Sequence, residues 1–216
     1  MTREARLWFS RGMILILAVF FSSASVWSSG KESHMPPLMN SNSHTVNLEV
    51  THLFHALKWV EWKEEDLPPA KKPVKCLIVG KDTFGFYDRL SFVFAESGTG
   101  IAGQPIDFVR LGSLDEALEL AKTDKTVMLL VALEAVAEEW DPTLFPKRPG
   151  VLVYGQSAKF SKKGVTFYSR SIHNRVKLSV NLRRARSSGL TLSSKLLEYK
   201  KIFTVDNGTA SGPLEK

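Results

Sequence analysis

The sequence predicts an α/β protein: a three-layer sandwich around a mostly parallel sheet, with an added C-terminal β-hairpin and helix. From residue 74 onward, apolar runs rich in Val, Ile and Leu alternate with stretches of helical period, which is the order of parallel βαβ units. Near residue 165 this alternation gives way to two neighbouring strand-like runs joined by a short polar loop, as in a hairpin. Of the 216 residues, 44% are hydrophobic, so we expect one domain with a buried core and exclude a disordered, collagen-like or polytopic membrane protein.

The N-terminus is typical of a secretory signal peptide, which we assign to residues 1–29. Three arginines precede the apolar residues 13–21, and small residues follow at 22–25. This apolar run falls short of the roughly 20 residues that a membrane-spanning helix needs. We therefore expect export to the periplasm with cleavage. An uncleaved N-terminal membrane anchor, with the domain facing the periplasm, is the alternative.

The positive charge of the chain is modest once this signal peptide is set aside. Lys and Arg number 29 against 22 Asp and Glu, a formal net charge of +7. Residues 1–29 hold three of the basic residues and one Glu, which leaves 26 against 21, or +5. No reader motif accompanies this charge, so we expect no nucleic acid partner. The single cysteine, Cys76, lies in an apolar run, so we expect it buried in a strand and without an internal disulfide.

The folded part is expected to begin with a helix. Within residues 47–62, Leu53, Leu57 and Val60 share one helical face, and prolines at 68 and 69 then stop the helix. The expected domain boundaries are a flexible lead rich in Ser, Asn and Pro over residues 30–49, the folded domain over residues 50–203, and a loose tail over residues 204–216.

Alternating strands and helices follow this first helix. Ser113 begins a capping box in front of a helix, Asn181 can cap a short basic helix that Gly189 ends in the left-handed conformation, and Ser193 can cap a last helix through Ile202. The expected strands span residues 74–79, 106–111, 126–133, 151–154, 165–169 and 176–182. The remaining expected helices span residues 86–96, 113–122 and 134–140.

Several glycine and serine motifs are better explained by turns than by cofactor or catalytic sites. Three glycines within residues 98–103 spell the dinucleotide-binding pattern, but they lie between a helix and the next strand, the reverse of the order that this pattern requires. Residues 80–85 have the right context for an anion site but lack the ending of a phosphate-binding loop. Ser157 resembles a hydrolase nucleophile, yet no carboxylate lies between it and His173. We therefore expect no catalytic residue, no cofactor and no enzyme.

The histidines and the basic residues also have simple structural explanations. His52 and His55 lie one helical turn apart but supply only two ligands, fewer than a closed metal site needs, so we expect no metal. Basic residues gather near the C-terminus, where a solvated helix face is the simple interpretation. A surface that faces anionic lipid or an acidic partner is the alternative.

Along about residues 50–203 the sequence resembles the YfiR-like family, periplasmic domains that repress membrane-bound diguanylate cyclases. The aromatic segment 52–62, the strand and turn 76–85 and the segment 102–106 are similar to the family in that order. The similarity is strongest over Gly150–Gly155, Phe160, Gly164, residues 176–182 and residues 189–197. Two positions differ, because residues 127–132 lack the cysteine that the family often has there, and Gln156 stands where an acidic residue is common.

The resemblance implies a non-catalytic regulatory module. Its partner would be the extracytoplasmic part of an inner-membrane signalling protein, a diguanylate cyclase of cyclic di-GMP signalling or a sensor histidine kinase, and a homodimer stays open. The alternative is a periplasmic small-ligand-binding protein that uses the C-terminal ends of the strands. The candidate partner or ligand contacts are Phe54, Trp59, Trp62, Asp82, Phe84, Gly85, Gln156, Phe160, Arg183 and Lys195.

Overall fold

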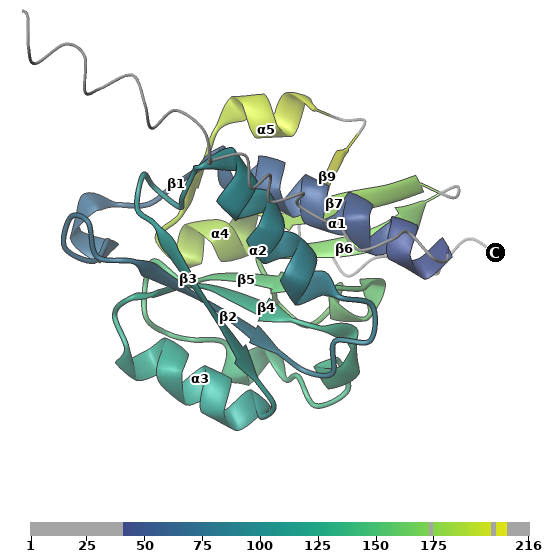
Figure 1. Ribbon diagram of the computed structural model, residues 1–216, viewed down its shortest axis with the longest axis horizontal. Helices are drawn as coiled ribbons and strands as arrows, with labels where there is room; N and C mark the ends of the chain where they lie inside the picture. The colour runs from purple at the N-terminus through teal and green to yellow at the C-terminus, as the bar shows by residue number, and fades with distance from the viewer. Residues whose placement is uncertain (1–40, 173–174, 200–201, 207–216) are drawn as a thin grey trace, which may run out of the picture. The chain divides into compact units, whose positions relative to one another are not determined.

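Seven strands form one sheet at the centre of the domain, in the order β3-β2-β4-β5-β6-β7-β9 (Figure 1). The computed structural model describes residues 41–172, 175–199 and 202–206. The expected signal peptide and most of the expected flexible lead therefore lie outside the described residues. A separate two-stranded sheet pairs β1 (Val60–Glu61) with β8 (Thr191–Leu192) in antiparallel orientation.

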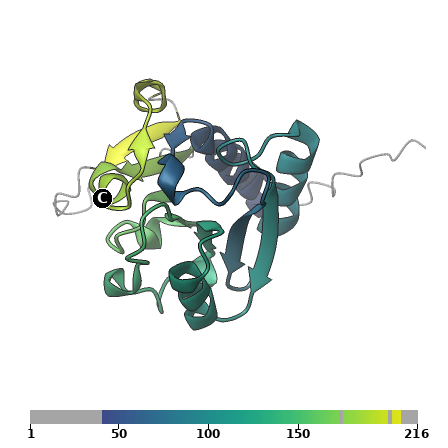
Figure 2. The same cartoon turned by 90° about the vertical axis from the view of Figure 1, so that its left-hand side faces the viewer.

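The central sheet is mostly parallel, which confirms the expected fold class. Every neighbouring pair from β3 to β6 is parallel, whereas β7 pairs with β6 in antiparallel orientation and β9 runs parallel to β7. Figure 2 shows the last strand, in yellow, at the opposite end of the sheet from the first two. The strands are β2 (Val74–Val79), β3 (Ile106–Leu111), β4 (Val127–Ala132), β5 (Leu152–Gly155), β6 (Phe167–Ile172), β7 (Arg175–Asn181) and β9 (Phe203–Asp206).

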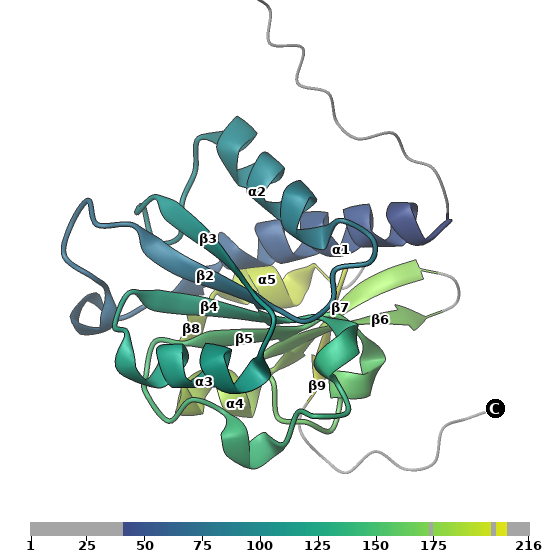
Figure 3. The ribbon, with the colours of Figure 1, turned by 60° about the horizontal axis from the view of Figure 1, so that its bottom comes forward.

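Helices cover both faces of the sheet. Figure 3 shows α1 (Ser41–Leu57) and α2 (Phe86–Ser97) on one face and α3 (Leu114–Thr123) on the other. The buried apolar side chains accordingly fall into two clusters, one for each face. The central strand β4 is buried along its whole length, as a strand covered on both faces must be. The shorter elements are η2 (Glu64–Asp66), η3 (Glu134–Val136), η4 (Pro142–Leu144), η5 (Ala158–Phe160), α4 (Leu182–Ser187) and α5 (Ser194–Glu198).

The predicted helix ends are confirmed at their capping residues. The Ser113 hydroxyl accepts a hydrogen bond from the Glu116 amide, and the Asn181 side chain accepts one from the Arg184 amide at 2.9 Å. Gly189 has a φ of 72°, the left-handed conformation expected for a residue that ends a helix. These caps place α3 and α4 where local sequence predicted them.

Two boundary predictions were wrong. The first helix begins at Ser41 and ends at Leu57, so residues 41–49, assigned to the flexible lead, are helical and Trp62 lies beyond the helix. The physical reason is that Val46 and Val50 continue the apolar stripe of Leu53 toward the N-terminus, and all three side chains are buried.

The expected loose tail also begins later than predicted. Residues 204–206 belong to β9, where Thr204 and Val205 pair with Ser179 and Val180 of β7. The neighbouring Phe203 is only 5% exposed, and the burial of its ring holds this strand against the sheet. The preceding helix α5 is correspondingly shorter than expected and ends at Glu198. On the other face, the short helix expected over residues 134–140 is reduced to the 3-10 turn η3, Glu134–Val136.

Candidate functional surface

The turn after β2, a predicted ligand-contact site, is filled by its own carboxylate. Asp82 accepts hydrogen bonds from the amides of Phe86 at 2.8 Å and Tyr87 at 2.9 Å, at the N-terminus of α2. Arg110 lies 3.7 Å from the same carboxylate, whose side chain is only 6% exposed. A helix N-terminus attracts anions, and here the chain supplies the anion itself.

The turn after β5 is closed in a similar way. The ring of Phe160 is fully buried against Gly155, so close that a Cβ atom on Gly155 would lie 2.3 Å from it. Ser157, the residue that resembles a nucleophile, accepts a hydrogen bond from the Lys159 amide and caps η5. Both turns at the C-terminal ends of the strands are therefore occupied by side chains of the protein.

Gln156 links this edge of the sheet to the first helix. Its side-chain oxygen accepts a hydrogen bond from the Glu134 amide at 3.2 Å, and its amide nitrogen donates to the Glu49 carboxyl at 3.3 Å. The sequence analysis did not single out Glu49. It lies next to Val50 on the buried side of α1, and an acidic residue beside an apolar stripe was the signal that could have found it.

Glu49 is a buried acid without a basic partner among its hydrogen bonds and ion pairs in the described residues. Its side chain belongs to a residue only 7% exposed, and this burial raises the pKa of its carboxyl to about 8, with a further contribution from Glu134. The nearby phenol of Tyr154 is fully buried and hydrogen-bonded to the Ser169 hydroxyl at 2.7 Å. At neutral pH the folded chain therefore holds a proton on Glu49.

The three predicted aromatic contacts at the end of the first helix differ in exposure. Phe54 is 8% exposed and packs edge-on against Phe94, and the Trp62 indole donates a hydrogen bond to the Gly150 carbonyl at 2.8 Å. Both belong to the core, and their burial argues against a surface role. Trp59 is half-buried, and the Lys195 ammonium of α5 lies 5.3 Å from the centre of its ring.

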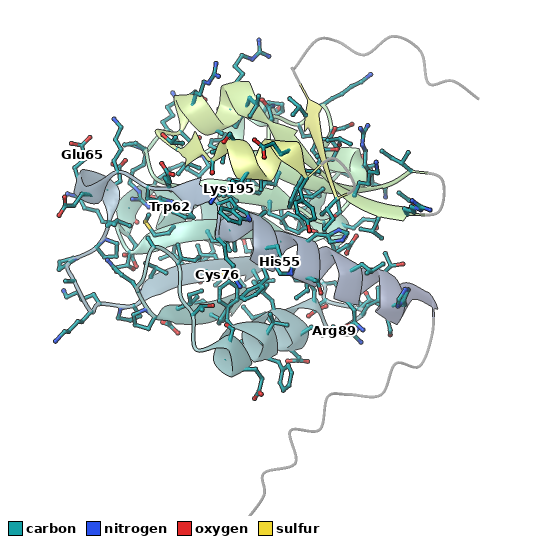
Figure 4. The ribbon with its side chains drawn as sticks, turned by 90° about the horizontal axis from the view of Figure 1, so that it is seen from above. His55, Trp62, Glu65, Cys76, Arg89 and Lys195 are labelled. Atoms are coloured by element: carbon teal, nitrogen blue, oxygen red, sulfur yellow. The ribbon has the colours of Figure 1, made fainter. Side chains whose placement is uncertain are left out.

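Three basic residues lie near Trp59, two shortly before it in the chain and one on α5, and burial and Lys58 lower the pKa of His55 among them. His55 is exposed in the last turn of α1, and Lys58, just after the helix, is exposed with its ammonium 4.1 Å from the centre of the Phe54 ring. Lys195 is exposed on α5; it and His55 are labelled in Figure 4. The backbone holds the two elements together, because the Ser193 amide donates a hydrogen bond to the Trp59 carbonyl at 2.9 Å. We call the set His55, Lys58, Trp59 and Lys195 the Trp59 surface.

The other predicted contacts lie elsewhere. Phe84 is 37% exposed in the turn after β2, and Gly85 adopts a left-handed φ of 73° as the N-cap of α2. Arg183 is exposed on α4, and Phe160 is buried in the core. The structure thus brings Trp59 together with Lys195, and Asp82 together with Phe84 and Gly85, but it does not gather the ten residues into one site.

The thiol and the histidines offer little reactivity. Cys76 is fully buried in β2, and this burial raises the pKa of its thiol. Burial also lowers the pKa of His52. Within residues 41–172, 175–199 and 202–206, no group of three or more His, Cys, Asp or Glu side chains could hold a metal ion. None of the helices in that part of the chain has the length and apolar character needed to cross a bilayer.

Comparisons with known proteins place this fold in a family. Among curated proteins, none matches the chain. A crystal structure of a conserved domain protein from Vibrio cholerae O1 biovar El Tor str. N16961 is similar with a TM-score of 0.49 and 13% identity, covering 74% of this chain and 60% of that one. The chain thus spans less than two thirds of the length of that protein. The YfiR/HmsC-like family matches residues 47–199. The protein therefore belongs to the YfiR/HmsC-like family, as the resemblance in its sequence implied.

Proposed function

We propose that this protein is an exported, non-catalytic regulatory domain that binds the extracytoplasmic part of a membrane signalling protein. The partner class is a diguanylate cyclase, with a sensor histidine kinase as the second candidate. Membership of the YfiR/HmsC-like family carries this proposal, because the YfiR-like domains it resembles regulate diguanylate cyclases from the periplasm. The N-terminal sequence pattern, typical of a signal peptide, supports the location.

Regulation by such a domain requires binding alone and no catalysed reaction. A domain that binds one conformation of its partner more tightly than another shifts the population toward that conformation by the ratio of the two affinities. A roughly tenfold preference therefore shifts the ratio of the two conformations by up to about tenfold. The repressed state of the cyclase is the conformation that the protein would favour.

The Trp59 surface is the contact region that the geometry supports best. Half-buried tryptophans at the centre of an interface often dominate its binding free energy, because they bury much area at little entropic cost. The Lys195 ammonium lies against Trp59, which stays half-buried, and Lys58 is exposed next to it in the chain, so the surface complements an acidic partner. The strand-end turns favour docking over small-ligand binding, because Asp82 and Phe160 fill them.

A genetic experiment tests the proposal. Deletion of the gene is expected to raise the cellular concentration of cyclic di-GMP. Reintroduction of the wild-type gene is expected to lower it to the repressed level again. The Lys195→Glu variant reverses an exposed charge without touching the core, so it should fold and fail to restore the repressed level. Lys125→Glu is the matched control, because this exposed lysine precedes β4 and lies outside the Trp59 surface.

The same strains separate the alternatives. Crosslinking in membranes should capture a cyclase or kinase with the wild type and the control but not with Lys195→Glu. Capture of a second copy of this chain would instead indicate a homodimer. A ligand that raises the melting temperature without any partner would favour the small-ligand-binding function. Unchanged cyclic di-GMP after deletion, together with no captured membrane protein, would refute the proposal.

A further inference from the structure

A basic groove lies between α4 and the segment around η4. Its volume is about 470 Å³, and the side chains that shape it include Thr143, Phe145, Lys147, Arg184 and Ser188. Two of the lining residues are cations and none is an acid. Several other cations of the described residues, by contrast, lie within ion-pair distance of a carboxylate.

Arg184 is held in one orientation. Its Nε atom donates a hydrogen bond to the Gly164 carbonyl at 2.7 Å, and its guanidinium carbon lies 4.0 Å from the centre of the Phe145 ring. Stacking on an aromatic ring and a hydrogen bond at Nε together fix the plane of the guanidinium. The Nη groups, which make no hydrogen bond with the described residues, are left to bind a ligand.

The charge of Arg184 is uncompensated in the described part of the chain. The side chain is half-buried, and its pKa is lowered by this burial and by the neighbouring Arg183. None of the ion pairs there involves Arg184 or Lys147, which both line the groove. Partial burial of a cation without a counter-ion costs free energy, and a bound anion would offset that cost.

We propose that this groove binds a phosphate-bearing anion. The Nη groups of Arg184 donate two parallel hydrogen bonds to phosphate oxygens, and Lys147 supplies the second positive charge. A fixed guanidinium fork matches the geometry of a phosphate, and two cations match its double negative charge. Ser188, which is only 4% exposed, also lines this groove.

Two sources offer this chemistry to a protein outside the cytoplasm. A phosphomonoester in solution fits the size of the groove, and the headgroup of an anionic phospholipid presents the same group on a membrane surface. Arg183 and Arg186 are exposed on α4, the helix that carries Arg184, and such cations contribute to attraction by an anionic membrane. This groove is separate from the Trp59 surface, so the anion-binding proposal does not depend on the proposed regulatory function.

The test uses the purified protein with two kinds of probe. Isothermal titration measures binding of inorganic phosphate and glycerol phosphate, and flotation measures binding to vesicles of phosphatidylglycerol or of phosphatidylcholine alone. Lys147→Gln alters an exposed side chain and should weaken binding about tenfold, the value of one charge-assisted hydrogen bond. Arg184→Gln should weaken it at least as much, and Arg184→Lys should recover only part because it lacks the fork.

Lys125→Gln, an exposed lysine outside the groove, serves as the control and should bind as the wild type does. Circular dichroism verifies that each variant is folded. Binding of the soluble phosphates that Lys147→Gln weakens would identify a phosphomonoester site. Binding only to phosphatidylglycerol vesicles, again weakened by Lys147→Gln, would identify a lipid headgroup site. No binding to either probe, or binding that Lys147→Gln and Lys125→Gln change equally, would overturn the proposal.

Discussion

Replacement of Glu49 by Gln tests the buried acid of the first helix. The structure holds this carboxyl against Gln156 with a pKa of about 8, compared with 4.5 for a glutamate in solution. Between these two pH values the folded chain binds one more proton than the unfolded chain. The contribution of Glu49 to the free energy of unfolding therefore falls as pH rises from 4.5 to about 8 and is constant above that.

The size of the stability change follows from the difference between the two pKa values, 4.5 and about 8. Each pH unit is equivalent to about 1.4 kcal/mol, so the whole interval corresponds to about 5 kcal/mol and the part below neutrality to about 3 kcal/mol. Glutamine is neutral at every pH and keeps a hydrogen bond to Gln156. Glu49→Gln should therefore be more stable than the wild type near neutral pH by up to about 3 kcal/mol.

Urea unfolding followed by tryptophan fluorescence measures this difference at pH values between about 5 and 8. The difference between variant and wild type should grow with pH, and because both chains share His52, the titration of this histidine cancels. Glu138→Gln, at an exposed position, is the matched control and should show no such growth. A Glu49→Gln variant that is less stable than the wild type near neutral pH, or a difference independent of pH, would refute the reasoning.

Three further predictions concern the strand-end turns and the core. Gly155→Ala should lower the free energy of unfolding in urea by about 2–3 kcal/mol, because the new Cβ would lie 2.3 Å from the Phe160 ring. Asp82→Ala should lower it by about 1–2 kcal/mol, because two amides of α2 lose their acceptor. Cys76 should not react with a thiol reagent in the native protein and should react once urea unfolds the chain, because it is fully buried.

Matched controls separate these effects from general damage. A Cβ on Gly112 would meet no atom within 4 Å, so Gly112→Ala should leave stability nearly unchanged. Asp107 is exposed on β3, and Asp107→Ala should cost less than Asp82→Ala. Equal losses within either pair would contradict the contacts described for these turns. Rapid labelling of native Cys76 would show that β2 opens readily.

The sequence predicted the fold best where its signals were local. Two strands, Val74–Val79 and Ile106–Leu111, begin and end at the predicted residues, because continuous or alternating apolar runs bounded by turn residues identify strands directly. The caps at Ser113 and Asn181 were equally readable, since capping depends on residues three positions apart.

The predictions from the sequence were wrong where packing between residues far apart in the chain determines the secondary structure. The polar composition of residues 41–49 favoured a linker, and only the contact of Val46 and Val50 with the core makes that segment helical. The strand β9 is four residues long and gains its stability from β7, so no local pattern separates it from a tail.

The candidate site was predictable only in part. The kinds of residue that form it, an aromatic ring and basic side chains, were visible in the sequence, and Trp59 and Lys195 were both predicted as contacts. Which aromatic side chains stay at the surface was not visible, because Trp59 and Trp62 occur in the same aromatic segment and only the fold buries the second. The raised pKa of Glu49 likewise depends on burial in the folded chain, where its carboxyl meets Gln156 from a distant part of the sequence.

The antiparallel pair of β1 and β8 has a consequence for biosynthesis. Trp59 comes from an early part of the chain, whereas Lys195 and the amide of Ser193 are among its later residues, so the Trp59 surface does not exist until translation and folding are nearly complete. A truncated or misfolded copy would lack this surface altogether. A partner that binds through it would therefore be recognised only by complete, folded copies of this chain.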